Sequence, residues 1–289
     1  MMRFRCVTGN AISQVDMAAR LRASVFGKEL GYVRGLFAEV REIDPFDTLE
    51  TTRHVLLYAG EDLAGAARLL LPNTEVARGC GTRFGLAVES SLELTALHAA
   101  GATPAETTRV CVLPQYRNTP AMAHLHEALF EESRRHGVTH WVACANAETD
   151  SLEDARILLQ IARARGHVET ELWLPARKPA VGAGVEARSI FDDEARERAR
   201  RGDVSGLRLP PTLSLFTRTL GARVAGEPLY DGHFHMCSIP IVLPIARVSA
   251  WLSVRRNLMR RWGDRRMKGE AATESVRRRS SVPPPLGSN

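Results

Sequence analysis

The fold of this chain is decided by residues 105–117, which read Ala105-Glu106-Thr107-Thr108-Arg109-Val110-Cys111-Val112-Leu113-Pro114-Gln115-Tyr116-Arg117. The stretch predicts a short strand over Arg109–Leu113, with a Glu and an Arg at its entry and a Pro-led turn at its end. Apolar residues at helical spacing then predict a helix over Pro120–His136, and Thr139–Ala145 predicts a second strand. This order favours a parallel pair with a right-handed crossover, and α/β sheets usually bind ligands at the open mouth of such a pair.

The remaining segments predict one mixed α/β sheet with helices on both faces. They are a strand over 1–7, a helix over 11–26, a hairpin of strands 54–59 and 63–71, a short helix near 91–98, a helix over 151–165 ended by Gly166, a strand over 167–174 and strand-like segments within 207–244. This order resembles the N-acetyltransferase-like (GNAT) architecture more than a doubly wound nucleotide-binding fold. Neither GxGxxG nor GxxxxGK[ST] occurs, which counts against dinucleotide and P-loop chemistry.

Composition and charge narrow the class of protein. The 289 residues contain no apolar run near the roughly 18 residues of a spanning helix, and the start lacks the apolar core of a signal peptide. The five cysteines are widely spaced without a CxxC pair, which favours reduced thiols in a cytoplasm. Residues 247–279 hold eleven Lys/Arg and three Asp/Glu, which gives them a net charge of +8. Because the whole chain carries +6, the remaining residues carry −2. The basic character belongs to the tail, and we expect no nucleic-acid partner.

The N-terminal half resembles the acyl-homoserine-lactone synthases and the related N-acyl amino acid synthases, which take their acyl group from acyl carrier protein. The matching positions follow one another over about ninety residues. They are Arg22, Phe26 and Tyr32 (where the family usually has Trp), then Asp44 and Asp47, then Arg68 within Gly65–Pro72, and finally Glu106 and Arg109.

A second resemblance covers the C-terminal part and the central strand. Segments 209–211, 221–224 and 226–228, with Asp231 and Phe234, look like the closing part of the acyl-carrier-protein-dependent acyltransferases that build lyso-ornithine lipids. Arg109–Val112 and Tyr116–Arg117 look like that group too. The loop Arg117–Met122 departs from acetyl-CoA enzymes of this fold, because it has no glycine and Pro120 lacks an N–H for a pyrophosphate. Ala162 stands where those enzymes often carry a Tyr acid. Both departures favour a carrier-protein donor.

These resemblances imply a domain organisation. We expect a GNAT-like acyltransferase domain over residues 1–245, in which residues 176–206 form an insert with one exposed helix at 192–201. Residues 246–279 form a basic amphipathic tail, and residues 280–289 a Ser/Pro-rich disordered end. Such a tail fits contact with an anionic membrane or an acidic carrier protein, and a helix packed on the body with a solvated basic rim explains the same pattern.

Acyl transfer to an amine requires a base, a site for negative charge on the thioester carbonyl, and a route for the thiol proton. The catalytic candidates are Glu106, Arg109 and Glu42, with Glu106 favoured as the base. Backbone N–H groups near Val110 and Cys111 are the candidates for the oxyanion. The expected acyl-donor-binding residues are Arg22, Phe26, Tyr32, Arg68, Val110, Cys111 and Arg117, and the expected acceptor-binding residues are Asp44 and Asp47.

Plainer structural interpretations stand beside these roles. Glu106 and Arg109 pair with each other or with Arg68; Arg22 belongs to an ordinary amphipathic helix; Asp44 and Asp47 form a capped turn. We expect no metal site, because His233 and His235 have no further ligand near them in sequence and a packing or hydrogen-bonding role is favoured.

The sequence therefore predicts a cytoplasmic N-acyltransferase, peripheral at the inner membrane face if the tail binds there. It moves a fatty acyl group from an acyl-ACP or acyl-CoA thioester to the amine of an amino acid or a derivative, and it needs no resident cofactor. The products left open are an N-acyl amino acid, an acyl-homoserine lactone and a lyso-aminolipid. The alternative is a non-catalytic binding or regulatory module of the same fold at the membrane surface.

Overall fold

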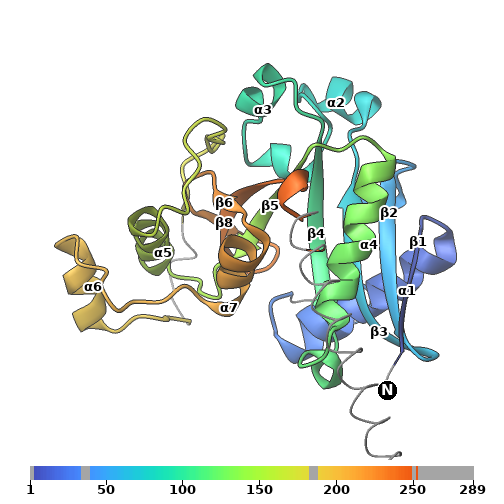
Figure 1. Ribbon diagram of the computed structural model, residues 1–289, viewed down its shortest axis with the longest axis horizontal. Coiled ribbons are helices and arrows are strands. Elements are labelled where there is room, and N and C mark those ends of the chain that lie inside the picture. Colours follow the sequence, from blue (N-terminus) through green and yellow to red (C-terminus); the bar gives the residue numbers. More distant parts are fainter. Residues whose placement is uncertain (1–2, 34–39, 182–187, 249–251, 253–289) are drawn as a thin grey trace, which may run out of the picture. The chain divides into compact units, whose positions relative to one another are not determined.

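The computed structural model describes residues 3–33, 40–181, 188–248 and 252 (Figure 1). The described residues up to 248 belong to one compact unit. The tail expected over 246–279 lies almost wholly outside the described residues, and the disordered end expected at 280–289 lies entirely outside them. Within the described ranges, no helix has both the length and the apolar character needed to cross a bilayer.

The described strands form one mixed sheet in the order β1-β2-β3-β4-β5-β8-β6, and β7 also pairs with β8. Only β4 and β5 run parallel; the other pairs are antiparallel. The strands are β1 (Phe4–Gly9), β2 (Thr52–Ala59), β3 (Asp62–Leu70), β4 (Pro104–Val112), β5 (His140–Asn146), β6 (Arg223–Val224), β7 (Leu229–Asp231) and β8 (Met236–Pro244). The expected mixed sheet, its hairpin and its parallel pair are confirmed.

The described helices flank this sheet. They are α1 (Ile12–Arg22), α2 (Thr74–Cys80), α3 (Thr95–Ala99), α4 (Ala121–Arg135), α5 (Leu152–Ala164), α6 (Asp193–Arg200) and α7 (Pro211–Ser214). Two of them continue as π-helical turns, α1 through Ala23–Glu29 and α7 through Leu215–Leu220. The helix α5 begins at Ser151, whose hydroxyl accepts the N–H of Asp154, and Gly166 follows its end at φ 65° as expected for a C-terminal cap.

The strand register places α1 and α4 on opposite faces of the sheet. Leu56, Ala66 and Cys111 lie side by side across β2, β3 and β4 and pack with Leu21 of α1. The next row, which contains Gly65, points to the other face, toward Leu125 of α4. A Cβ at residue 65 would lie 2.8 Å from a backbone oxygen of β4, so only glycine allows α4 and the strands to approach this closely.

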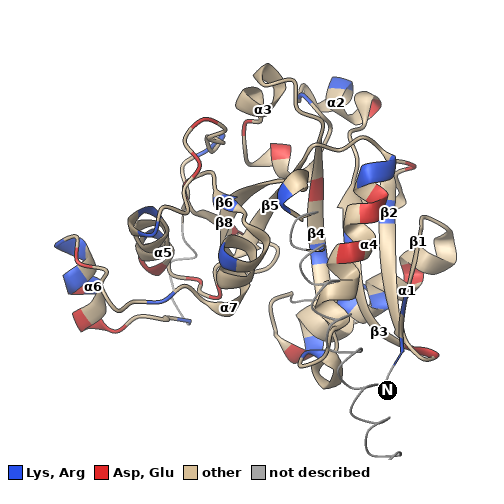
Figure 2. Ribbon diagram, viewed as in Figure 1, with Lys and Arg blue, Asp and Glu red and all other residues tan. Residues whose placement is uncertain are grey.

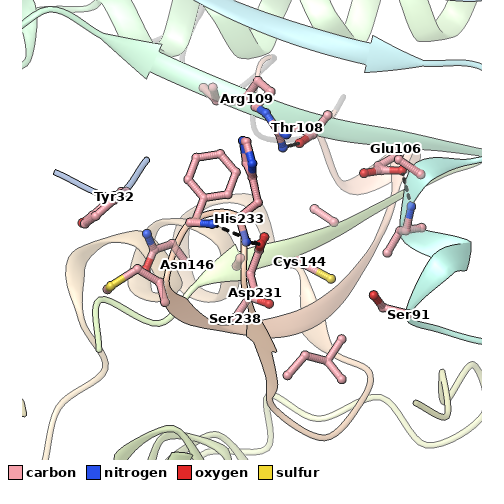
Figure 3. A pocket seen from close by; sticks show the side chains of 18 of the residues that line it. Tyr32, Ser91, Glu106, Thr108, Arg109, Cys144, Asn146, Asp231, His233 and Ser238 are labelled. Carbon is pink, nitrogen blue, oxygen red and sulfur yellow. Dashed lines mark hydrogen bonds between the residues drawn. The ribbon is translucent and has the colours of Figure 1, made fainter. Parts of the chain in front are cut away.

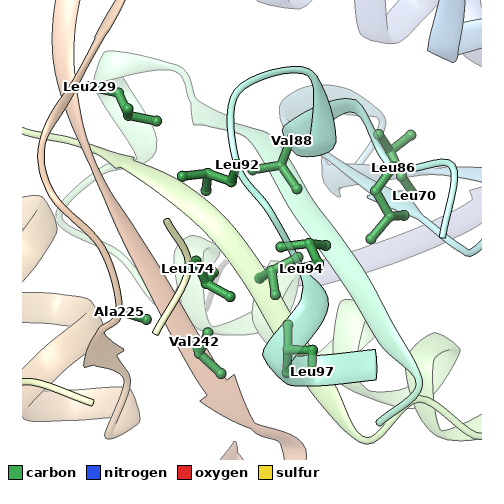
Figure 4. Packing of buried hydrophobic residues seen from close by; sticks show 11 residues of the cluster. Leu70, Leu86, Val88, Leu92, Leu94, Leu97, Leu174, Ala225, Leu229 and Val242 are labelled. Carbon is green, nitrogen blue, oxygen red and sulfur yellow. The ribbon is translucent and has the colours of Figure 1, made fainter. Parts of the chain in front are cut away.

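A leucine-rich cluster anchors the chain segment that precedes β4 (Figure 4). The fully or nearly fully buried members include Leu70, Leu92, Leu94, Leu97 and Leu174, which pack with residues of β5 and β8. Burying a leucine side chain stabilises the fold by roughly 1.5–3 kcal/mol, so this cluster firmly holds the chain over residues 86–97. That segment delivers a backbone N–H to the candidate site.

Several expected elements need correction. The central strand is longer than Arg109–Leu113 and contains Glu106 within it, because residues from Pro104 onward pair with β5. The strand expected over 167–174 is wrong: only Val168 bridges to Val224, and the chain then turns where Glu169 Oε1 accepts the N–H groups of Thr170 and Glu171. The short helix expected near 91–98 begins only at Thr95, since Leu92 is engaged in a β-bridge.

Candidate active site

The candidate site lies where β4 and β5 separate. Their parallel register covers only Pro104–Glu106 against His140–Val142, and β5 then continues alongside β8. Past that point β4 bulges against β3, and Arg109 takes φ 57°, a conformation that non-glycine residues rarely adopt. The diverging strands open a cavity of about 420 Å³ (Figure 3). The expected ligand-binding mouth is thus present, built by a bulge that sequence periodicity does not reveal.

The structure brings some of the sequence-predicted residues to this cavity and leaves others outside it. Those that line it are Phe26, Tyr32, Asp44, Arg68, Glu106, Arg109 and Val110. Those that do not line it are Arg22, Glu42, Asp47, Cys111 and Arg117. The rest of the wall comes from β5, from the segment around Val88, from α7 and its continuation, and from β7, β8 and the turn between them, where Asp231, His233 and Phe234 lie.

One side of the cavity is backed by a set of buried charges that we call the ion network: Arg22, Arg68, Arg109, Glu42, Asp44 and Asp47. Arg22 donates to both carboxylate oxygens of Asp47 at 2.9 Å and lies 2.8 Å from Glu42 Oε2. Arg68 donates to both oxygens of Asp44, at 2.8 and 2.9 Å, and to Asp47 Oδ1. Their guanidinium groups are each about 1% exposed. Buried arginines of this kind need carboxylate partners, and here each has two.

Arg109 joins the ion network to the cavity wall. Its Nε donates to Glu42 Oε1 at 2.9 Å and its Nη2 to Asp44 Oδ2 at 3.1 Å, and its guanidinium carbon lies 4.6 Å from the ring centroid of Phe234. Glu106 is not hydrogen-bonded to Arg109 or Arg68, so the simple pairing considered from the sequence is not what the structure shows. Arg109 pairs instead with carboxylates far from it in the chain.

The ion network keeps its acids ionised. Burial by itself raises the pKa of Glu42, but a hydrogen bond from His233 and the charges of Arg109 and Arg22 lower it to about 2. Burial likewise opposes ionisation of Asp47, yet the hydrogen bonds from Arg22 and the charge of Arg68 hold its pKa well below the usual value. Neither acid is placed to take a proton from a ligand in the cavity.

Asp44 and Asp47 come from a single 3₁₀ turn, Pro45–Thr48, and are used differently. Asp44 caps the turn by accepting the N–H of Phe46, and Asp47 Oδ2 accepts the N–H of Asp44 in return. The side chain of Asp44 is 20% exposed and lines the cavity, whereas that of Asp47 is fully buried in the ion network. The capped turn and the charge cluster are thus the same feature, and only Asp44 faces the cavity.

Glu106 is the carboxyl that differs from the rest. It lies on the cavity wall, and its Oε2 accepts the backbone N–H of Val88 at 2.8 Å (Figure 3). Burial raises the pKa of Glu106 above its ordinary value and outweighs the Val88 hydrogen bond and the charges of Arg68 and Arg109. A carboxyl with a raised pKa in a cavity is typical of a general acid or base.

The segment that holds Val88 is itself organised by a buried carboxylate. Glu89 is 1% exposed; its Oε1 accepts the N–H of Arg83, and its Oε2 accepts those of Phe84 and Leu86, at 2.8–3.0 Å. The leucine-rich cluster then packs the following residues against the sheet. The hydrogen bond to Glu106 therefore comes from a rigid element.

The turn between β7 and β8 supplies residues whose roles sequence reasoning underestimated. Asp231 Oδ1 accepts the N–H groups of His233 and Phe234, which fixes the turn. His233 Nε2 then lies 3.1 Å from Glu42 Oε1, across 191 positions of sequence. Because ionised Glu42 only accepts, Nε2 of His233 carries the proton. His233 and His235 both lie in the turn that precedes β8.

Aromatic rings close the other side of the cavity. The rings of Phe26 and Phe234 meet edge to face, with centroids 5.3 Å apart. Arg188 stacks over Tyr32 at 4.8 Å and donates to the carbonyl of Leu30 at 2.9 Å. Arg188 lies in the segment expected to be an insert, and no pattern in the sequence singled it out.

The two donor-binding candidates of β4 and the following turn have other partners. Arg117 Nε donates to the carbonyl of Val112 at 3.0 Å and its Nη2 donates to Glu29 at 2.7 Å, on the outside of the structure. The thiol of Cys111 is buried against α1, where burial raises its pKa to about 12. Cys144 lines the cavity with a thiol pKa that burial also raises to about 12. Neither thiol is activated as a nucleophile.

Comparison with known proteins agrees with this geometry. The acetyltransferase (GNAT) domain family matches residues 21–127 of the chain. An L-ornithine N(alpha)-acyltransferase of Brucella abortus (strain 2308) is 25% identical over 254 residues, which are 83% of this chain and 84% of that protein. An L-ornithine N(alpha)-acyltransferase of Rhizobium meliloti (strain 1021) is 25% identical over 246 residues, or 82% of this chain and 78% of that protein.

Among solved structures, the chain is similar to FeeM, an N-acyl amino acid synthase from uncultured soil microbes. That alignment has a TM-score of 0.49 and 14% identity and covers 88% of this chain and 95% of the other. The GNAT family match covers the end of α1, the 3₁₀ turn that follows Asp44 and strands β2, β3 and β4, and it contains the residues of the ion network and Glu106. The resemblances stated from the sequence, and the GNAT-like mixed fold they implied, are confirmed.

Proposed function

The chain carries an acetyltransferase (GNAT) domain and is an acyltransferase, and on that premise we propose that it transfers a fatty acyl group from a thioester to the amine of an amino acid or amino-acid derivative. The observation that carries the proposal is Glu106, a buried carboxyl of raised pKa on the wall of the cavity between β4 and β5. The thioester of acyl carrier protein is the proposed donor, with coenzyme A as the other possible carrier.

Glu106 is the proposed general base. An amine attacks a thioester only when unprotonated, and a carboxylate whose pKa lies nearer neutrality accepts the proton more readily than an ordinary one. As the C–N bond forms and the C–S bond breaks, the amine proton passes to Glu106, which then gives it to the leaving thiolate, so that the products are the amide and the free thiol. The Val88 hydrogen bond to Oε2 leaves Oε1 as the oxygen for this proton.

The cavity wall provides the other requirements of the reaction. Past Glu106 the edge of β4 is no longer paired with β5, so the backbone at Val110 lies beside the cavity, where an N–H group can stabilise the thioester oxyanion. Apolar side chains on the opposite wall, among them Phe216, Leu229 and Met236, offer a surface for an acyl chain.

Recognition of the acceptor is proposed for Asp44. Its side chain is 20% exposed on the cavity wall, and Arg68 and Arg109 orient its carboxylate, so a cationic amine in the cavity would meet the exposed part of this group. The similarity to two L-ornithine N(alpha)-acyltransferases makes ornithine the first acceptor to test. Arg109 and Glu42 act as positioning residues in this scheme, and the reaction requires no resident cofactor.

The proposal is tested with the purified full chain. Long-chain acyl thioesters of acyl carrier protein and of coenzyme A are each incubated with L-ornithine and other amino acids, and products are identified by mass spectrometry. We expect an N-acyl amino acid from wild type and a loss of about 10²–10⁴-fold in kcat/KM for Glu106→Gln, the usual contribution of a general base. Glu75→Gln, which neutralises an exposed carboxylate of α2, is the matched control and keeps full activity.

Two results would overturn the proposal. One is a folded protein that yields no acylated amine with either thioester class and any amino acid. The other is a Glu106→Gln variant as active as the Glu75→Gln control at every pH tested, which would leave acyl transfer without this base.

A further inference from the structure

A second cavity, of about 510 Å³, lies on the far side of α7 from the candidate active site. We call it the basic pocket: Arg165, His167, Arg208, Leu209, Ser214 and Arg218. Its residues come from the end of α5, the loop before α7, and α7 with its π-helical continuation (Figure 2). The catalytic cavity uses Thr212 and Phe216 of the same helix, so the two cavities share one element but no lining residue.

The arginines of the basic pocket have no carboxylate partner among the described residues. Several other arginines of this part of the chain do have one: Arg163 pairs with Glu227 at 3.0 Å, Arg198 with Asp203 at 3.0 Å, and Arg200 with Glu153 at 2.6 Å. In contrast, Arg165 donates only to the carbonyl of Leu207. A helix C-terminus favours a cation at Arg165, but that effect does not extend to the loop and helix that hold Arg208 and Arg218.

His167 senses the uncompensated charge. Its imidazole is partly buried in the pocket, and its pKa is lowered by burial and then by the positive charges of Arg223, Arg165 and Arg218. Of these, Arg223 is held beside the pocket by a hydrogen bond to the carbonyl of Gly166. The neighbouring positive charges thus add to burial in opposing protonation of His167, and a bound anion would offset the part that these charges contribute.

We propose that the basic pocket binds a phosphate-type anion. Guanidinium groups present forked donors that match phosphate oxygens, and the three arginines converge from three different segments, as a chelating site requires. A dianion would offset most of their formal charge of +3. The cavity is larger than a phosphate ion, so it also admits a phosphate monoester.

The phosphate has two plausible sources with the same chemistry. One is free inorganic phosphate; the other is the phosphate of the pantetheine arm that carries the acyl group, and this second source rests on the proposed function. In the turn after β4, Arg117 donates to the carbonyl of Val112 and to Glu29, and Pro120 has no N–H to offer a phosphate. Binding itself can be measured without turnover, so failure of this inference is separate from failure of acyl transfer.

The test follows the His167 ring by NMR in the full chain labelled with ¹³C-histidine, with His167→Gln to identify its signal. Inorganic phosphate should raise the pKa of His167 with saturating dependence on concentration, because anion binding favours the imidazolium. Sodium chloride at equal ionic strength controls for screening, which changes the pKa without saturation. Arg218→Gln should weaken phosphate binding about tenfold, the loss expected for one charge-assisted contact. Arg163→Gln, which removes an exposed arginine of α5 that is paired with Glu227, should not weaken it.

The inference is overturned if phosphate and chloride give the same titration of His167, or if Arg163→Gln weakens phosphate binding as much as Arg218→Gln does. The source is assigned by comparing the affinities of pantetheine 4′-phosphate and inorganic phosphate, with pantetheine as the control that lacks the phosphate. Binding of the phosphorylated arm at least tenfold tighter than inorganic phosphate, with a raised KM for acyl donor in Arg218→Gln, assigns the pocket to the donor. Equal affinities of the two phosphates, with an unchanged KM for the acyl donor in Arg218→Gln, assign the pocket to a free anion.

Discussion

Two groups of three arginines in this protein have opposite surroundings. In the ion network, Arg22, Arg68 and Arg109 share Glu42, Asp44 and Asp47, and the guanidinium groups are between 1% and 14% exposed. In the basic pocket, Arg165, Arg208 and Arg218 are exposed and have no carboxylate partner within the described ranges. The same side chain thus serves as a fixed part of the fold in one region and as an open ligand site in the other.

The comparison distinguishes arginines whose charge helps to hold the fold together from arginines whose charge is free to bind a ligand. The ion network joins α1, the 3₁₀ turn, β3, β4 and the turn before β8, so it fixes the geometry of one cavity wall. Buried pairs of this kind often add little net stability, but removing one partner leaves a buried charge uncompensated. Exposed arginines carry no such liability, since water solvates them until an anion arrives.

The largest expected effect breaks the ion network. Replacing Arg68 with Met leaves Asp44 and Asp47 without their shared cation, and we expect the free energy of unfolding to fall by about 3–5 kcal/mol. Denaturant unfolding monitored by circular dichroism measures this. Arg68→Lys, which keeps the charge but loses the forked geometry, should fall between wild type and Arg68→Met. An Arg68→Met variant as stable as wild type would show that the network is dispensable.

Acid should weaken the ion network next. The pKa of Glu42 is lowered to about 2, below an ordinary value near 4.5, so its contribution to stability is complete above about pH 4.5 and is lost as pH falls toward 2. The pKa of Asp47 is also lowered, so it acts in the same direction. The raised pKa of Glu106 acts in the opposite direction, but it stands against two lowered ones.

We therefore expect urea unfolding to show a loss on the order of 3 kcal/mol between pH 5 and pH 2. Asp16→Asn serves as the control, because the Asp16 carboxylate pairs with Arg20 and Arg41 on the surface, where solvent screens the interaction. Its acid dependence should match that of wild type. A wild-type stability that stays flat down to pH 3 would contradict the low pKa of Glu42.

Local sequence patterns predicted much of the fold. Helical spacing located α4 and α5, and Gly166 marked the end of α5. The hairpin of β2 and β3 followed from alternating apolar segments around Gly60. Two features had no local signal: the π-helical turns that extend α1 and α7, and the point at which β4 parts from β5. Both depend on packing across the sheet rather than on the residues of the element itself.

The sequence identified all six members of the ion network and gave them donor, acceptor and catalytic roles beside plainer structural ones. It could not show which of them face the cavity, because nothing local distinguishes a carboxylate that faces a cavity from one that faces an arginine. Asp44 and Asp47 are three positions apart in one turn and have different surroundings. For His233 the sequence favoured a packing or hydrogen-bonding role over metal binding, but it could not name the partner, because Glu42 lies 191 positions away. Long-range pairs of this kind emerge only from the folded sheet.

A change at His233 tests how far the ion network governs activity. His233 holds Glu42, which in turn anchors Arg109 on the cavity wall. Removing it with His233→Asn should lower kcat/KM about tenfold, as expected for the loss of one charge-assisted hydrogen bond that orients a site. The free energy of unfolding should change by less than about 1 kcal/mol, since the His233 side chain is 46% exposed.

His235→Asn is the matched control in the same turn. His235 has φ 48°, which Asn tolerates well, and the structure gives it no bond to the ion network. Its activity and stability should stay at wild-type values. If both variants lose activity equally, the loss reflects the turn as a whole, and His233 has no positioning role of its own.

The smallest expected effect comes from the basic pocket and completes the contrast. Arg218→Gln removes an exposed charge with no carboxylate partner among the described residues, so without phosphate the free energy of unfolding should change by less than about 0.5 kcal/mol. Phosphate should stabilise wild type by about 1.4 kcal/mol at ten times its Kd, because a ligand that binds only the folded state shifts the equilibrium toward it. At the same phosphate concentration Arg218→Gln should gain roughly half that or less. Thermal melts with and without phosphate, matched with sodium chloride for ionic strength, measure both quantities. If replacing an arginine of the ion network and replacing an arginine of the basic pocket lower the free energy of unfolding equally, then pairing with carboxylates does not distinguish the two regions.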